Sequence, residues 1–397
     1  MTLSYLTAVG GLGLFLLGML LMTDGLRGLA GNTLRRMLRR STRNPATGAV
    51  AGAATTALLQ SSSATTVAAV GFVGAGLMTF TQALGVIFGA NIGTTVTGWL
   101  VAIVGFKLQL GLVLVPFVLF GVLLKLFGRG RWKHVGWALA GFSLLFVGIT
   151  AMQEGMSVLK GIVSPTDFPQ DTMLGRLQLI GIGITITLVT QSSSAGVATA
   201  LAALTAGAIS LPQAAAMVIG MDVGTTFTAA LATVGGAVAT RRTGYAHVIY
   251  NVLTGIMAFF LLIPLGWLIE IWSAAGRTID PQIALVAFHT AFNLLGVVAV
   301  IGVTAQFARL ITWLVPERGP RLTARLDERL LADAAAATDA AAATIKDISS
   351  ALFSVFAGQL ATGGSGDTER DLQAIGHAEE ETRRYAERIR TAPDQPL

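Results

Sequence analysis

Long hydrophobic runs make up most of the chain, and charged residues stand mainly between these runs. A run of about 20 apolar residues can cross a bilayer as a helix. The runs are continuous and do not alternate apolar with polar residues, which favours helices over a membrane barrel. The pattern predicts an all-α polytopic membrane protein with spanning helices at 3–23, 83–104, 109–127, 134–153, 213–235, 245–269 and 282–307.

Two further apolar stretches, 46–80 and 177–210, each carry the polar sequence QSSS near the middle. Consecutive serines give no advantage at the centre of a helix that faces lipid. Irregular backbone is tolerated at membrane depth where protein or a water-filled cavity surrounds it. We therefore expect each stretch to be a re-entrant hairpin of two half-length helices, with QSSS at its tip.

Basic residues indicate the orientation, because Lys and Arg accumulate in loops on the cytoplasmic side of a membrane. Three basic clusters border hydrophobic runs, and all of them fall inside if neither hairpin crosses the bilayer. These clusters are Arg27 to Arg43, Arg129 to Lys133, and Arg241 with Arg242. The chain is thus expected in a plasma or inner membrane, with its N-terminus outside and its C-terminus in the cytoplasm.

Composition narrows the class of protein. The chain of 397 residues is 53% hydrophobic and 12% charged, with a mean hydropathy of +0.70, which argues against a soluble domain of this length. Its net charge of +6 is explained by topology rather than by nucleic-acid binding. The absence of cysteine excludes disulfides, thiolate metal sites and a cysteine nucleophile.

An internal duplication appears when the chain is offset against itself by 131 residues. This offset aligns 60–97 with 191–228, and fifteen of the 38 positions are identical. An offset of 130 aligns 14–26 with 144–156. The first repeat contains three spans, an odd number, so the second is predicted to be inverted in the membrane. Inverted repeats with interrupted helices are typical of secondary transporters.

The duplication also divides the chain into parts. We expect membrane repeat 1 at 1–133, membrane repeat 2 at 134–270, a last spanning helix within 271–310 and a cytoplasmic tail at 311–397. The tail is charged, with an Ala-rich run at 331–344 and a glycine break at 362–366, and its pattern predicts two helices. Its last residues, 391–397, are expected to be disordered.

The repeated QSSS motifs point to a binding site. If the two tips meet, the half-helices that follow them direct their N-termini at a common centre, where free N–H groups and the helix dipole favour an anion. Serine hydroxyls add donors without a fixed charge, which suits a compact tetrahedral oxyanion that must also be released. The predicted oxyanion ligands are Ser61, Ser62, Ser63, Ser192, Ser193 and Ser194.

A second repeated phrase reads GANIGTT in one half and GMDVGTT in the other. Its glycines would permit local unwinding inside a spanning helix, and the exposed carbonyl and hydroxyl oxygens would suit Na+. Asp222 could partner a cation or titrate as a proton site, because a carboxylate inside the membrane is a functional candidate by default. The predicted sodium ligands are Gln60, Asn91, Thr94, Thr95, Gln191, Asp222, Thr225 and Thr226.

Each polar residue also has a simpler explanation. A single membrane serine or threonine often bonds back to the preceding helical turn, although this explains a matched pair of motifs poorly. We expect His247 and His289 as packing residues, with a shuttle or ligand role as the alternative, and Asn251 and Asn293 as bonds between helices. An intramembrane serine hydrolase is disfavoured because the symmetric serine triplets lack a matched Ser–His pair, so no enzyme activity is expected.

These motifs together carry a family resemblance. QSSSATT with GANIGTT, QSSSAGV with GTT, and the flanking GLFLLGMLLMTDGL and AFHTAFNLLG resemble the bacterial form of the type II sodium–phosphate cotransporter family, over about 1–310. The resemblance implies Na+-coupled movement of inorganic phosphate at the hairpin tips and unwound helices. That family usually has Asn in both halves, so Asp222 leaves the ion stoichiometry open. The tail is similar to the opening of PhoU-like helical domains, truncated to about two helices.

Other functions within the same fold stay open. They are a phosphate exporter, a carrier of another oxyanion such as arsenate or sulfate, and a phosphate-sensing membrane protein. The expected partners are inorganic phosphate, sodium and the lipid bilayer, with no nucleic acid, and a homodimer is left open.

Overall fold

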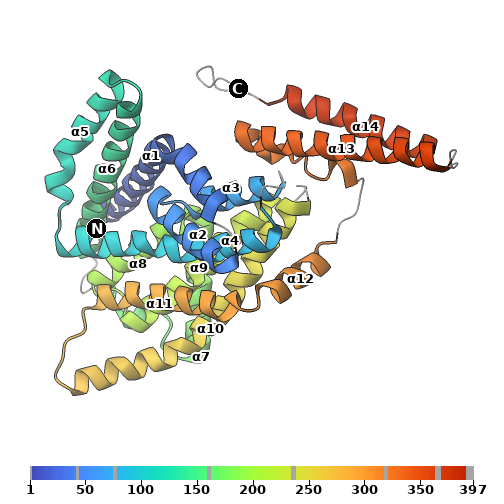
Figure 1. The fold of residues 1–397 in the computed structure, drawn as a ribbon. Coiled ribbons are helices and arrows are strands. Elements are labelled where there is room, and N and C mark those ends of the chain that lie inside the picture. The colour runs from blue at the N-terminus through green and yellow to red at the C-terminus, as the bar shows by residue number, and fades with distance from the viewer. Residues whose placement is uncertain are drawn as a thin grey trace.

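The computed structural model describes residues 2–41, 44–74, 78–158, 162–233, 238–316, 321–362 and 368–389, which form helices and no strand (Figure 1). The part before residue 130 comprises α1 (Thr2–Ser41), α2 (Pro45–Leu59), α3 (Ser62–Gly74), α4 (Phe80–Leu100), a π-helix (Val101–Lys107) and α5 (Gly111–Phe127). It is followed by α6 (Arg131–Ser157), α7 (Met173–Thr190), α8 (Ser193–Thr205), α9 (Leu211–Thr233) and α10 (Val238–Ala274). The chain then forms α11 (Pro281–Ile301), α12 (Thr304–Leu314), α13 (Ala334–Thr362) and α14 (Thr368–Glu387).

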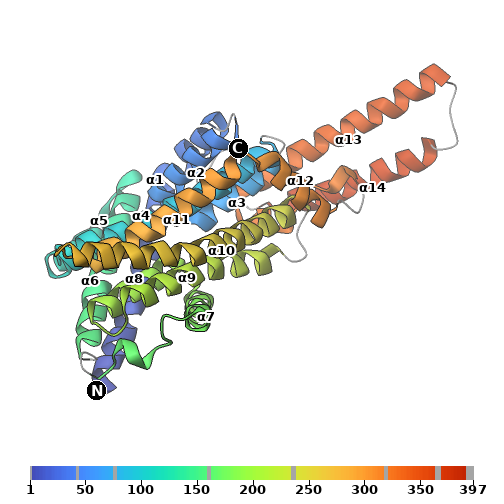
Figure 2. The ribbon, with the colours of Figure 1, turned by 90° about the horizontal axis from the view of Figure 1, so that it is seen from below.

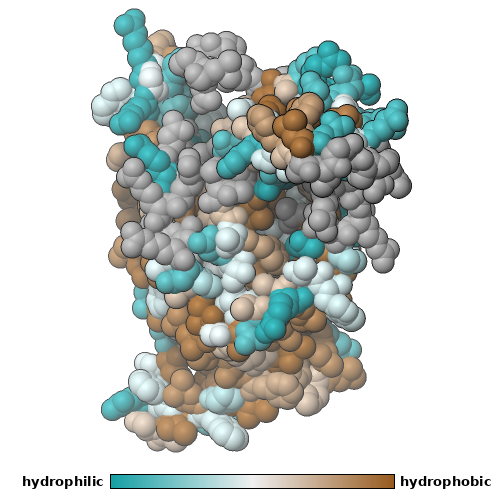
Figure 3. All heavy atoms as spheres, turned by 45° about the vertical axis from the view of Figure 1, so that its right-hand side comes forward, coloured by the Kyte–Doolittle hydropathy of each residue, from teal (hydrophilic) through white to brown (hydrophobic). Residues whose placement is uncertain are grey.

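Seven helices in the described part of the chain are long and apolar enough to cross a membrane. They include most of α1, α6, α10 and α11, and the run of α4 with the π-helix over Phe80–Lys107. α7 and α13 also meet the criteria of length and composition, although the sequence predicts a half-helix at the first and a cytoplasmic helix at the second. Hydrophobic residues cover much of the lower part of the face in Figure 3. The predicted class, an all-α polytopic membrane protein, is confirmed.

Both QSSS motifs interrupt a helix at the same residue. The backbone turns between α2 and α3 at Gln60 and between α7 and α8 at Gln191, with φ angles of 54° and 55°. The left-handed region is unusual for a residue with a Cβ atom, and here it ends one helix so that the next can start in another direction. The predicted breaks are therefore present at both motifs. That each pair re-enters the membrane on the side it left stays a prediction.

The predicted unwinding of the second repeated phrase does not occur. α4 is a continuous α-helix through Asn91, and α9 is continuous through Asp222. The glycines have another purpose, because a methyl group at Gly89 would overlap the carbonyl oxygen of Ala49, and one at Gly220 would overlap that of Ile180. Glycine at these places lets α2 lie directly on α4 and α7 directly on α9, as small residues do in membrane helix pairs.

These close contacts follow the duplication of the sequence. Gly89 and Gly220 are 131 residues apart, and so are their partners Ala49 and Ile180. The two halves therefore repeat the contact between a half-helix and the helix that follows the hairpin, as well as the sequence.

α1 and α6 pack along each other through a reciprocal set of glycines. An added Cβ at Gly11 would meet the carbonyl of Gly148, and one at Gly18 would meet the carbonyl of Gly141. With the offset of 130, Gly11 corresponds to Gly141 and Gly18 to Gly148. Each contact is thus the image of the other, as a local twofold axis between the two helices requires.

The hydrophobic core joins the two halves to the later helices. Its largest cluster includes Phe15 from α1, Phe146 from α6, Leu201 from α8, Ile219 from α9 and Phe292 from α11. Figure 2 shows α4, α8, α9, α10 and α11 running alongside one another. α10 and α11 contact each other, and each of them contacts both α4 and α9. This packing holds the two interrupted helices against a common centre.

The tail forms α13 and α14, which pair with each other, and α13 contacts α3 in the first half of the molecule. Val70 of α3 packs in one cluster with Leu330, Ala336 and Ala340 of the tail. Thr240 of α10 donates a hydrogen bond to the carboxylate of Asp327. Burial raises the pKa of Tyr385 to about 12, and its hydroxyl donates to the carbonyl of Asp327 at 2.7 Å. The predicted glycine break at 362–366 and the residues 391–397 lie almost wholly outside the described residues.

Candidate functional site

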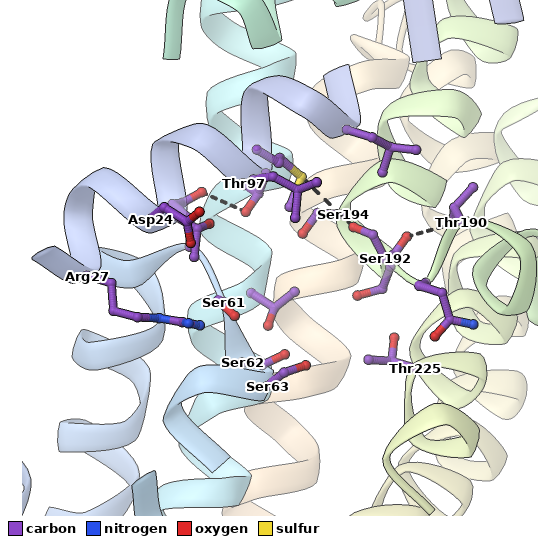
Figure 4. A pocket seen from close by; sticks show the side chains of 18 residues that line it. Asp24, Arg27, Ser61, Ser62, Ser63, Thr97, Thr190, Ser192, Ser194 and Thr225 are labelled. Carbon is purple, nitrogen blue, oxygen red and sulfur yellow. Dashed lines mark hydrogen bonds between the residues drawn. The ribbon is translucent and has the colours of Figure 1, made fainter. Parts of the chain in front are cut away.

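The two QSSS turns meet at one cavity of about 450 Å³, to which α1, α4, α7 and α9 also contribute (Figure 4). All six predicted oxyanion ligands line it. The complete lining is Leu16, Met19, Leu20, Thr23, Asp24, Arg27, Gln60, Ser61, Ser62, Ser63, Thr94, Thr97, Thr190, Gln191, Ser192, Ser193, Ser194 and Thr225. The convergence expected from the duplication is therefore present in the structure.

The first residues of each motif shape the turn. Gln60 and Gln191 donate from their side-chain amides to carbonyls three residues earlier, those of Ala57 and Leu188, both at 2.6 Å. These bonds satisfy carbonyls at the end of the first half-helix, which otherwise lack an intrahelical partner. Neither glutamine amide nitrogen is therefore free to act as a simple ligand in this conformation.

The first serine of each motif caps the second half-helix. The backbone N–H of Ala64 donates to Ser61 Oγ, and that of Ala195 donates to Ser192 Oγ, both at 3.2 Å. The remaining serines, Ser62 and Ser63 in one half and Ser193 and Ser194 in the other, occupy the first turn of α3 and α8. N–H groups in a first helical turn have no intrahelical acceptor, so each half-helix offers the cavity backbone donors together with hydroxyls.

Electrostatics at this centre favour an anion. The N-termini of α3 and α8 both face the cavity, and each carries a partial positive charge from the helix dipole. Arg27 of α1 adds a full positive charge, and Figure 4 shows its side chain extending towards the turn at Ser61. From the sequence, Arg27 is expected only as a charge that indicates topology and no fixed charge is expected in the site, whereas Arg27 lines the cavity in the structure.

Only some of the predicted sodium ligands line the cavity. Thr94 and Thr225 line the cavity, as do Gln60 and Gln191 from the predicted sodium set. Thr97, which the sequence interpretation missed, lines it too and donates to Gln60 Oε1 at 2.8 Å. Thr97 could have been predicted from the sequence, because it lies one helical turn after Thr94 in the same repeated phrase.

The other predicted sodium ligands, Asn91, Thr95, Asp222 and Thr226, are not among the lining residues. The hydroxyls of Thr95 and Thr226 donate to carbonyls three residues earlier in their own helices, those of Ile92 and Val223. This is the ordinary back-bonding of membrane threonines.

Asp222 belongs to a buried polar cluster beside the cavity. His289 Nε2 lies 3.0 Å from one carboxylate oxygen, and Asn293 donates to the other at 2.7 Å. Both partners come from α11, and Asn251 of α10 donates to the backbone carbonyl of Asp222 at 3.3 Å. Asn293 and Asn251 therefore bond between helices as predicted, and His289 has a specific polar partner beyond packing.

The cluster extends to the first half of the molecule. Asn91 donates to Asn251 Oδ1, and His247 Nε2 lies 3.4 Å from Asn91 Oδ1. Because Asn251 bonds both Asn91 and Asp222, one residue of α10 joins the equivalent positions of α4 and α9. Among the described residues no group of three or more His, Cys, Asp or Glu side chains forms a metal site.

Fold and site together define a polytopic α-helical membrane protein with a serine-lined internal cavity. Residues 14–154 match the family model described as Na+/Pi-cotransporter. The match covers α2 to α5 in full and most of α1 and α6.

Curated relatives extend the similarity beyond that segment. The chain is 29% identical over 305 residues to "Uncharacterized protein YqeW" of Bacillus subtilis, covering 77% of this chain and 96% of the relative. It is 27% identical over 339 residues to "Putative inorganic phosphate export protein YjbB" of Salmonella typhimurium, covering 83% of this chain and 59% of the relative. The protein of the same name from Escherichia coli K12 is 26% identical over 334 residues, 82% of this chain and 58% of that one. No solved structure matches the chain significantly.

Proposed function

We propose that this protein is a secondary active transporter that couples Na+ to the movement of inorganic phosphate by alternating access. The observation that carries the proposal is the meeting of two duplicated serine turns at one cavity. The family match and the phosphate export named for the YjbB relatives support the substrate class. The family name is also the support for Na+ as the coupling ion, and a transporter of this kind is not an enzyme.

The mechanism requires two halves that exchange roles. We propose that 1–133 and 134–270 are inverted-topology repeats and that α2–α3 and α7–α8 are re-entrant hairpins. The reciprocal glycine contacts of α1 with α6 support such an axis, and α3 and α8, at 13 residues each, are too short to span a bilayer alone. Rocking of one half against the other would then open the serine cavity to each side in turn.

Phosphate would be bound by the donors that face this cavity. We assign it Ser62, Ser63, Ser193 and Ser194 with the N–H groups of the first turns, while Ser61 and Ser192 hold the turns in shape. Na+ would bind beside it through oxygens of Thr94 and Thr225, with Gln60 and Gln191 as further candidates. Asn91, Thr95, Asp222 and Thr226 would contribute to a sodium site only after a rearrangement that brings them to the cavity.

The orientation and setting are proposed on the distribution of basic residues. We place the protein in a bacterial inner membrane. Its N-terminus is then outside the cytoplasm, and its tail at 311–397 is in the cytoplasm. The direction of net transport is a separate question, because the name of the YjbB relatives gives export and the family name gives cotransport. A homodimer stays a proposal to be tested by mass measurement in detergent.

The test is uptake of radiolabelled phosphate by proteoliposomes that contain the full chain, with Na+ or choline outside. We expect uptake that depends on Na+, and equal uptake in choline would refute the coupling. Ser62→Ala and Ser193→Ala should each weaken phosphate affinity about tenfold or more, because each removes a donor from the bound anion. Ser143→Ala is the control, since Ser143 lies in α6 with its hydroxyl bonded to the carbonyl of Leu139.

A further inference from the structure

The wall of the cavity formed by α1 carries two charged residues that face the serine turns. Asp24 and Arg27 both line the cavity and lie three positions apart, which places them on one side of the helix (Figure 4). Both are exposed in the structure, so their side chains are accessible to a solute in the cavity. Arg27 suits any anion, whereas a carboxylate in an anion site needs a separate explanation.

Asp24 is the only carboxylate among the residues that line the cavity in the described part of the chain. The donors that face a ligand include the Arg27 guanidinium, the hydroxyls of the serines that follow each turn and the first N–H groups of α3 and α8. The two glutamine amides and four of the five threonine hydroxyls of the lining already donate to oxygens of the protein. An ionised carboxylate can only accept. A ligand that fits the whole cavity must therefore present oxygens to these donors and one O–H donor to Asp24.

Tetrahedral oxyanions differ in this property. Phosphate and arsenate keep at least one proton at neutral pH, so one oxygen can donate to a carboxylate. Sulfate keeps no proton at neutral pH. The Asp24 carboxylate would therefore repel its oxygens and could not accept a hydrogen bond from them. A site with a polar group that needs a partner discriminates strongly against an analogue that lacks the matching hydroxyl.

We propose that Asp24 determines specificity by accepting a hydrogen bond from the protonated oxygen of the substrate, so that the cavity selects protonated oxyanions over sulfate. Arg27 offsets the charge of Asp24 on the same wall, so that the carboxylate rejects an unprotonated anion without repelling every anion. This inference rests on the proposed transport of an oxyanion through the serine cavity and adds which oxyanions are accepted.

The duplication supplies a matched control. With the offset of 130, Asp24 corresponds to Glu154 of α6, and Glu154 is not among the lining residues. Arg27 corresponds to Ser157. Glu154 therefore serves as the control. It is acidic and exposed like Asp24, but it does not line this cavity.

The experiment compares phosphate and sulfate binding to the purified full chain by calorimetry, together with competition of phosphate, arsenate and sulfate in the proteoliposome assay. The unchanged protein should prefer phosphate and arsenate over sulfate by about 100-fold. Asp24→Asn should lower that ratio at least tenfold, because its amide can donate to sulfate. Glu154→Gln should leave the ratio unchanged. Asp24→Ser serves as a second variant if the asparagine protein is poorly folded, as judged by its gel-filtration profile.

The outcomes separate the two proposals. An unaltered ratio in folded Asp24→Asn or Asp24→Ser, or a change only in the Na+ dependence, would overturn the role of Asp24 and leave phosphate transport intact. Binding of sulfate as tight as that of phosphate by the unchanged protein would also overturn it. Absence of both phosphate binding and phosphate uptake in the unchanged protein would instead refute the proposed function.

Discussion

The two halves of the membrane part share their backbone plan and differ in the polar bonds built on it. Gln60 and Gln191 break their helices with the same left-handed geometry, and Ser61 and Ser192 cap the helices that follow with the same bond. Yet Gln60 is buried and receives a hydrogen bond from Thr97, whereas Gln191 is exposed. The turn is common to both halves, and its surroundings are specific to each.

The centre of the second repeated phrase differs in charge. Asn91 lies in a chain of neutral groups with Asn251 and His247, while Asp222 is held by His289 and Asn293. His289 and Asn293 belong to α11, which lies outside the duplicated region. A helix outside the duplicated segment thus provides the donors that a buried carboxylate needs. The helix packing is thus common to the two halves, and the polar partners at this equivalent position differ.

The largest expected effect tests the shared packing. Gly89→Leu and Gly220→Leu should each abolish the folded protein, because the new side chains would overlap the backbones of α2 and α7. Gly13→Leu is the control, since a Cβ at Gly13 would have no neighbour within 4 Å. Gel filtration of the solubilised proteins reads the result. Folded protein from either packing variant would show that the halves do not depend on this contact.

A smaller effect should separate Asp222 from Asn91. Asp222→Ala removes the acceptor of two buried donors and should lower the free energy of unfolding by about 3 kcal/mol. Asn91→Ala breaks only neutral hydrogen bonds and should cost about 1–2 kcal/mol. Asp222→Asn keeps the shape and should fall between them. Unfolding in detergent followed by tryptophan fluorescence gives the order, and equal losses for the two alanine variants would contradict the comparison.

The smallest effect should have opposite signs in the two halves. Thr56 donates to Thr65 at 2.9 Å, whereas the equivalent Thr187 is buried without a hydrogen-bond partner among the described residues, because Gly196 stands where Thr65 does. Thr56→Val should destabilise the protein by about 1 kcal/mol, because it removes the buried hydrogen bond to Thr65, whose hydroxyl keeps only its own bond to the carbonyl of Ser61.

Thr187→Val should be neutral or stabilising by up to about 1 kcal/mol, because it removes an unsatisfied hydroxyl at nearly constant volume. The midpoints of thermal unfolding of the two variants, measured side by side, check the signs. Destabilisation by both substitutions to the same extent would mean that Thr187 has a partner in solution.

Much of this arrangement could be predicted from the sequence. A polar triplet inside an apolar run is a strong local signal, and its repetition at a fixed offset indicated that the two turns would meet. The turns at Gln60 and Gln191 and the six cavity serines follow from that signal.

Other features depend on partners distant in the chain. Gly89 was interpreted as a point of unwinding because the sequence does not show that Ala49 lies against it. Arg27 was interpreted as a loop charge because its direction depends on how α1 packs against α6. Asp222 could be recognised as unusual, but its donors on α11 lie outside the repeat that drew attention to it.

The contact between α3 and the tail has a mechanical consequence. Ser62 starts α3 at the cavity, and Val70 and Gly71 of the same helix touch the tail at Ala336. Ser62 and Gly71 are only about 13 Å apart along the helix axis of α3. Any tilt of α3 that widens or narrows the cavity must therefore either move α13 with it or break the contact between the two helices. An interaction that holds α13 in place would therefore restrict the motion of the first serine turn without contacting the solute.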